Sequence, residues 1–155
     1  MGIFSNVNNL QVVTDFEAQY GNQLCVDFPE LTKDSINIYT DEQGKGWIKE
    51  WDDRKDSPYT SNHIVNEVMR CEEVYNKCGF TREEEFAILA HELGHIAAGK
   101  RGEKNVNGFL EEKNADMMTV HLGLASYMKS ALQKMILLNL NPEKNAEMQQ
   151  RIDAL

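Results

Sequence analysis

The sequence predicts an α+β fold in which an N-terminal helix and a small three-stranded sheet precede a helical half. Three observations favour this class. Short segments of alternating polarity, bounded by Gly, Pro or Asp, lie before residue 52, as expected of strands. Beyond residue 80, apolar side chains recur instead with helical spacing. The length of 155 residues fits one domain, 1–155, with an adequate hydrophobic core.

The first half of the chain is expected to contain two helices and three strands. The first helix is expected over residues 8–20, with Gly21 ending it. The strands are expected at 23–28, 35–40 and 46–51, and they would form an antiparallel or mixed sheet. The stretch 61–78 predicts a helix that turns Ile64 and Val68 inward.

The helical half begins with a recognisable capping box. Thr81 is expected to be the N-cap residue, with Glu84 three positions later. The helix would end near Gly99, and a turn-prone stretch, 100–107, would connect it to a second helix beginning near Phe109. Two further helices are expected at 125–139 and 142–155, with Pro142 at the first position of the latter.

The pentapeptide His91-Glu92-Leu93-Gly94-His95 lies within the capped helix. Residues four apart share one face of a helix, so both imidazoles can bind one Zn²⁺. The glutamate between them lies near the same site and can take a proton from a metal-bound water. Composition alone would produce roughly 0.01 such matches in a chain of this length. The pattern therefore indicates a zinc hydrolase site.

A catalytic zinc site needs a third protein ligand and an open position for water. Glu112 and Asp116 lie four apart on the next helical segment, and the small Ala115 beside them would allow close helix approach. We interpret Glu112 as the ligand and Asp116 as the acceptor that orients a ligating histidine. Glu111 is the alternative ligand, although it lies about 100° away around the helix and suits a solvated position.

Together the two segments, 91–95 and 112–116, resemble the HExxH…ExxAD pattern of gluzincin metallopeptidases. The resemblance is to minigluzincins and the catalytic domains of CAAX-type proteases, with ImmA/IrrE-type peptidases as a related comparison. It covers roughly residues 81–155, where the tail segments 123–135 and 150–155 match more weakly. It implies a small zincin-like domain. The chain departs from the membrane proteases in lacking their spans, and only 16 residues separate His95 from Glu112.

The resemblance implies His91, His95 and Glu112 as zinc ligands, Glu92 as general base and Asp116 as their support. The expected function is a zinc-dependent metalloendopeptidase that hydrolyses peptide bonds through a metal-activated water. The alternative is a zinc-binding regulatory or partner-binding domain with a protease-like fold and little general proteolytic activity. The residue that would stabilise the oxyanion stays open among four candidates: Tyr59, His63, His121 and Tyr127.

Composition sets the expected surroundings of such an enzyme. A net charge of −9 argues against nucleic acid as a partner. No apolar run is long enough to span a membrane, and the N-terminus lacks the pattern of a signal peptide or a myristoylation site. The three scattered cysteines suit a reducing cytosol, so we expect a cytoplasmic protein. Expected partners are a peptide or protein substrate and, by analogy, a regulatory protein.

Overall fold

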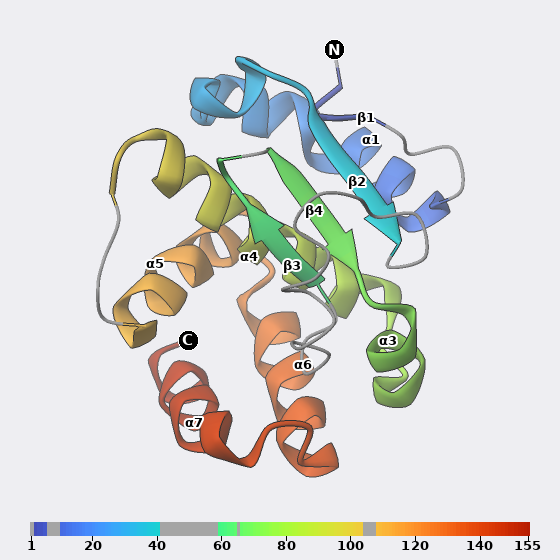
Figure 1. The fold of residues 1–155 in the computed structure, drawn as a ribbon, viewed down its shortest axis with the longest axis vertical. Helices are drawn as coiled ribbons and strands as arrows, with labels where there is room; N and C mark the ends of the chain where they lie inside the picture. Colours follow the sequence, from blue (N-terminus) through green and yellow to red (C-terminus); the bar gives the residue numbers. More distant parts are fainter. Residues whose placement is uncertain (1, 6–9, 41–58, 65, 104–107) are drawn as a thin grey trace.

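A computed structural model describes residues 2–5, 10–40, 59–64, 66–103 and 108–155 (Figure 1). The described elements run in the order β1 (Phe4–Ser5), α1 (Gln11–Asp27), η1 (Pro29–Thr32), β2 (Ile36–Thr40), β3 (Tyr59–Asn62), β4 (Glu67–Arg70), α3 (Glu72–Cys78), α4 (Arg82–Lys100), α5 (Gly108–His121), α6 (Ala125–Leu138), η2 (Pro142–Lys144) and α7 (Asn145–Ala154). An α+β architecture is confirmed.

The described strands form one mixed sheet in the order β1-β2-β4-β3. The first three strands in this order are parallel, whereas β3 pairs antiparallel with β4 at the end of the sheet. Asn66 has a left-handed φ of 58° in the β3–β4 connection, and its side-chain amide donates to the carbonyl of Ser35 at 2.7 Å. This turn ties the β3–β4 hairpin to the start of β2. The sheet therefore has four described strands where three were expected, and the strand expected at 35–40 is confirmed as β2.

The strand expected at 23–28 is wrong, because α1 continues through Gly21 to Asp27. Leu24 and Val26 alternate with polar residues, but Phe16, Tyr20 and Leu24 also recur four apart, and the helical pattern prevails. Leu24 is buried, and Val26 is 78% exposed. The alternating apolar residues that suggested a strand therefore do not form one buried face.

The helix expected at 61–78 is also wrong over its first half. Those residues form the end of β3, the turn at Asn66 and then β4, and only Glu72–Cys78 is helical. Val68 is buried as expected, but it lies on a strand, and Ile64 is 76% exposed in the turn. The strand expected at 46–51 lies outside the described residues.

The long helix α4 runs through the centre of the molecule, between the sheet and the C-terminal helices (Figure 1). Its capping box is confirmed: the Thr81 hydroxyl accepts from the Glu84 backbone N–H, and the Glu84 carboxylate accepts from the Thr81 N–H. The helix continues past Gly99 to Lys100, one residue beyond the expected stop. Nearly all of its residues from Glu84 to Ala97 are buried, so α4 is the core element that holds the site.

Helices α5 and α6 pack against α4 (Figure 1). The expected helices after residue 107 are confirmed as α5, α6 and α7, although residues 142–144 form a short 3-10 turn before α7. Helix α7 packs against both α5 and α6. Among the described residues, no helix has the length and apolar character needed to cross a membrane.

Candidate metal centre

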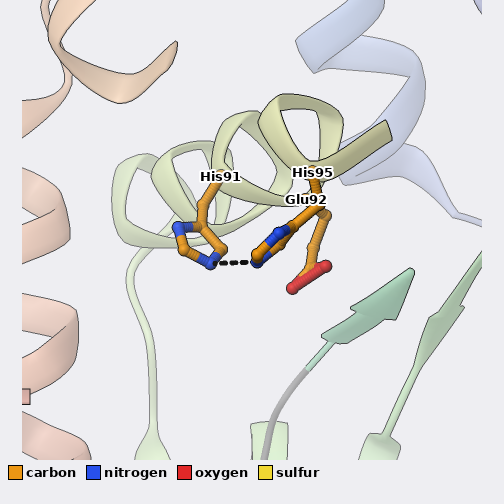
Figure 2. Close-up of side chains that lie close together, drawn as sticks. All are labelled: His91, Glu92 and His95. Atoms are coloured by element: carbon orange, nitrogen blue, oxygen red, sulfur yellow. Dashed lines mark hydrogen bonds between the residues drawn. The ribbon is translucent and has the colours of Figure 1, made fainter. Parts of the chain in front are cut away.

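Helix α4 presents His91, Glu92 and His95 from one side (Figure 2). Their potential ligand atoms all lie within 4.8 Å of one another, and the Nε2 atoms of the two histidines are 3.1 Å apart. His91 and Glu92 are buried, and His95 is partly exposed. The helical spacing of four residues accounts for the meeting of the two imidazoles. This group could hold a metal ion.

Helix α5 brings a second carboxylate to the same imidazoles. Glu112 Oε2 lies 2.9 Å from His91 Nε2, and Glu112 Oε1 lies 3.2 Å from His95 Nε2. Burial would raise the pKa of Glu112, but the two histidines outweigh burial and hold this pKa below its ordinary range. Glu112 is therefore a charged acceptor aimed at both histidines, as a metal ligand must be.

The donor set suits a divalent cation with nitrogen and oxygen ligands. Zinc binds histidine nitrogen and carboxylate oxygen at about 2.0–2.2 Å, so two ligands of a tetrahedral site stand about 3.3 Å apart. The separations among His91, His95 and Glu112 fall between 2.9 and 3.2 Å. Small side-chain movements would open these distances enough for a zinc ion, so the residues fit the metal.

Asp116 lies one turn beyond Glu112 and contacts the other nitrogen of His91. Asp116 Oδ1 is 2.7 Å from His91 Nδ1, and both side chains are buried. Burial lowers the pKa of His91, but the charges of Glu112 and Asp116 outweigh it and raise the pKa to about 10. A carboxylate at this position accepts the Nδ1 proton, so Nε2 is the nitrogen that could face a metal once it loses its own proton.

The close approach of α4 and α5 depends on two small residues. Gly94 packs directly on the backbone of Ala115, the small residue that was expected to permit close contact between these helices. Glu112 and Asp116 flank Ala115 by three and one positions, so this contact sets their distance from α4. The glycine within the HExxH pentapeptide thus has a packing role of its own.

Glu92 is held from the sheet. The hydroxyl of Ser61, on β3, donates to Glu92 Oε2 at 2.7 Å. Glu92 therefore faces the strand at the end of the described sheet, while Glu112 faces the paired imidazoles. The two carboxylates therefore have different partners: Ser61 contacts Glu92, and the paired imidazoles contact Glu112.

Arg151 is a site residue that no local sequence motif marks. It lies on α7, is 7% exposed, and donates to both carboxylate oxygens of Asp116. The signal that could have found it is its place between Met148 and Ile152, on the apolar face of the last helix. An arginine on a buried face needs an acidic partner.

Two other residues were candidates from the sequence: Glu111 as a metal ligand and His121 as the residue that stabilises the oxyanion. Glu111 precedes Glu112 on α5, but the carboxylates that contact His91 and His95 in the described part of the chain are those of Glu112 and Asp116. His121 pairs with Asp27 at 2.8 Å.

Three candidates for the oxyanion-stabilising residue remain after His121. Tyr127 is 40% exposed on α6, and Tyr59 begins β3. The ring of His63 lies over Gly99, which follows His95 by one helical turn on the same face of α4. His63 therefore contacts α4 one helical turn away from His95.

No family model, curated protein or solved structure matches the chain.

Proposed function

We propose that this protein is a zinc-dependent metallopeptidase of the gluzincin type. One observation carries the proposal: the Glu112 carboxylate reaches the Nε2 atoms of both His91 and His95, at 2.9 and 3.2 Å. Two histidines of an HExxH helix and a glutamate from the following helix make up the three protein ligands of a catalytic zinc site. His91, His95 and Glu112 would hold the metal in this protein.

The remaining residues would complete the chemistry. A bound zinc ion supplies a Lewis acid, which polarises a carbonyl group and lowers the pKa of a water molecule. Glu92 would accept the proton of the attacking water and then deliver it to the leaving amine. Ser61 would orient Glu92 for this transfer, and Asp116 would hold His91 in the tautomer that presents Nε2 to the metal.

The proposed substrate is a peptide in an extended conformation. β3 stands at the end of the described sheet and carries Ser61, which contacts the proposed general base. A peptide that pairs with such a strand gains main-chain hydrogen bonds. A substrate aligned along β3 would therefore pass close to Glu92.

The metal assignment is tested by metal analysis of the purified full chain. We expect one Zn²⁺ per chain, lost in His95→Ala and in Glu112→Gln. Glu111→Gln is the matched control for the glutamate, and His121→Ala is the control for the histidine; both should keep the metal. Full zinc content in Glu112→Gln, together with loss in Glu111→Gln, would transfer the ligand role to Glu111.

The peptidase assignment is tested separately with a peptide library. We expect zinc-loaded wild type to cleave a subset of the peptides, and Glu92→Gln to retain zinc but lose at least 100-fold in kcat. Equal inertness of both proteins would reject the peptidase and leave a zinc-binding regulatory or partner-binding domain. Equal activity of both would reject Glu92 as the base.

A further inference from the structure

Arg151 connects the C-terminal helix to the candidate metal centre. Its Nε lies 2.8 Å from Asp116 Oδ2, and its Nη2 lies 2.9 Å from Asp116 Oδ1. Two parallel N–H···O bonds of this kind hold the carboxylate in one orientation and also stabilise its negative charge. Asp116 Oδ1 is also the atom that lies 2.7 Å from His91 Nδ1. The guanidinium therefore orients the group that orients His91.

Arg151 also lies close to Glu112 and His91. Its Nη1 lies 3.4 Å from Glu112 Oε2, and its Nη2 lies 3.3 Å from His91 Nδ1. One buried cation thus borders a proposed histidine ligand, the proposed glutamate ligand and the supporting aspartate. Each of these three residues lies on α4 or α5, whereas Arg151 comes from α7.

The charges of the site balance only when Arg151 is counted. Glu92, Glu112 and Asp116 carry three negative charges, and a divalent metal would neutralise two of them. The guanidinium neutralises the third, and it does so at Asp116, the carboxylate that is not a proposed ligand. A buried carboxylate without such a partner would be strongly unfavourable. Arg151 therefore leaves the other two carboxylates to match the metal.

Helix α7 docks through the same face. Met148, Arg151 and Ile152 are its buried residues, spaced three and four apart on one side of a 10-residue helix. Arg151 is buried together with these two apolar residues and binds Asp116, so α7 cannot leave the bundle without releasing Asp116. The contact between Arg151 and Asp116 therefore contributes both to the docking of α7 and to the geometry of the site.

We propose that Arg151 is a positioning residue through which α7 sets the affinity of the site for its divalent metal ion. This inference rests on the proposed function, because it requires His91, His95 and Glu112 to be the ligands. Outer partners of metal ligands typically contribute 10–100-fold in affinity, and we expect this range for Arg151. Pure electrostatics predicts the opposite sign, because removal of a nearby cation should favour binding of a second cation.

The test measures the affinity of the full chain for Zn²⁺ by competition with a chromophoric chelator. It also measures the visible absorption of the Co²⁺-loaded protein. We expect Arg151→Met to bind Zn²⁺ 10–100-fold more weakly than wild type and to change the Co²⁺ spectrum. Arg151→Lys keeps the positive charge but cannot form the bidentate contact with Asp116, so it should recover only part of the affinity. Met148→Ala removes an apolar anchor of α7 without touching Asp116, so it is the control for loss of stability and should stay within threefold of wild type.

Different results would reject the role of Arg151 and the metal site itself. Wild-type affinity or tighter binding in Arg151→Met would overturn the role of Arg151 while leaving the metal site intact. If Arg151→Met does not fold, Arg151→Lys provides the test. Full Zn²⁺ affinity and an unchanged Co²⁺ spectrum in Arg151→Lys would overturn the role of the bidentate contact with Asp116. Equal loss of affinity in Met148→Ala would overturn a specific role for Arg151. Absence of Zn²⁺ binding in wild type itself would reject the metal site and this inference with it.

Discussion

Gly94 lies so close to Ala115 that a Cβ atom on Gly94 would stand 2.6 Å from the Ala115 carbonyl oxygen and 2.9 Å from its Cα. Both atoms belong to the backbone of α5, so the clash can be relieved only by a shift of the helix. Glu112 and Asp116 would move with it. The spacing between α4 and α5 and the geometry of the candidate metal centre therefore depend on the same contact.

We accordingly expect Gly94→Ala to weaken both folding and metal binding. Overpacking of this kind costs about 1–3 kcal/mol, which for a chain of this size corresponds to a fall in Tm of about 2–12 °C. Calorimetry and Zn²⁺ titration measure the two effects. Gly108→Ala is the control, because the nearest atom to its new Cβ would be 3.9 Å away. An unchanged Zn²⁺ affinity in Gly94→Ala would show that α5 does not set the site geometry.

Zinc should stabilise the protein, because the proposed ligands come from two different helices. A ligand that binds only the folded state at 100 times its Kd adds about 2.7 kcal/mol to the free energy of unfolding. We expect a chelator to lower Tm by about 5–11 °C and zinc to restore it. In His95→Ala the chelator should have little effect, and an equal response there would place the stabilising metal elsewhere.

The hydrogen bond from Ser61 to Glu92 predicts a specific kinetic change. Without it, the Glu92 carboxylate loses the partner that holds it, and a displaced general base lowers the rate of the chemical step. On the proposed function, Ser61→Ala should lower kcat about 10-fold, with KM and zinc content unchanged. Ser126→Ala, at an exposed position on α6, is the control. A wild-type kcat in Ser61→Ala would show that Glu92 needs no such anchor.

The helices around the site could be predicted from the sequence because their signals are local. The capping box of Thr81 and Glu84 and the i, i+4 spacing of His91 and His95 each fall within one or two turns. The pairing of Glu112 with α4 also followed, since a short connection brings consecutive helices together. The ligand and base roles of these residues remain predictions.

The errors and omissions have non-local causes. At 23–28, alternation and helical spacing fit the same residues, and only packing decides between them. At 61–78, the left-handed Asn66 lies in the turn between β3 and β4, and apolar periodicity does not reveal such a turn. Arg151 was missed because its partner Asp116 is 35 residues away in the sequence and on another helix. Long-range ion pairs leave no periodic signal.

The cysteines should differ sharply in reactivity. Burial raises the pKa of Cys78 to about 11, so at pH 8 only about one thousandth of it is thiolate. Cys71 is fully buried, whereas Cys25 is partly exposed. We expect one of the three thiols to react rapidly with a disulfide reagent in the native protein, and all three after denaturation. Cys25→Ser should abolish the rapid phase and Cys78→Ser should keep it; the reverse pattern would contradict the burial of Cys78.

The capping residue Glu84 should make the stability of the protein depend on pH in the acid range. Burial would raise the pKa of this carboxyl, but hydrogen bonds from Lys134, Ser130 and the Thr81 backbone outweigh burial and lower the pKa below its ordinary value of 4.5. A group whose pKa is lower in the folded state stabilises the protein above its unfolded pKa. That stabilisation disappears as the pH falls through the folded pKa.

Glu84→Gln isolates this charge, because glutamine can still accept the capping hydrogen bond from Thr81. We expect the variant to be about 1 kcal/mol less stable than wild type at pH 7, a modest value since Lys134 is partly exposed. The difference should shrink as the pH falls below 4.5. Urea unfolding between pH 3 and 7 measures it, and Glu83→Gln, at an exposed position in the same turn, should stay within about 0.5 kcal/mol of wild type throughout. A difference that is constant across this range would mean that the Glu84 charge contributes nothing and that the substitution acts through packing alone.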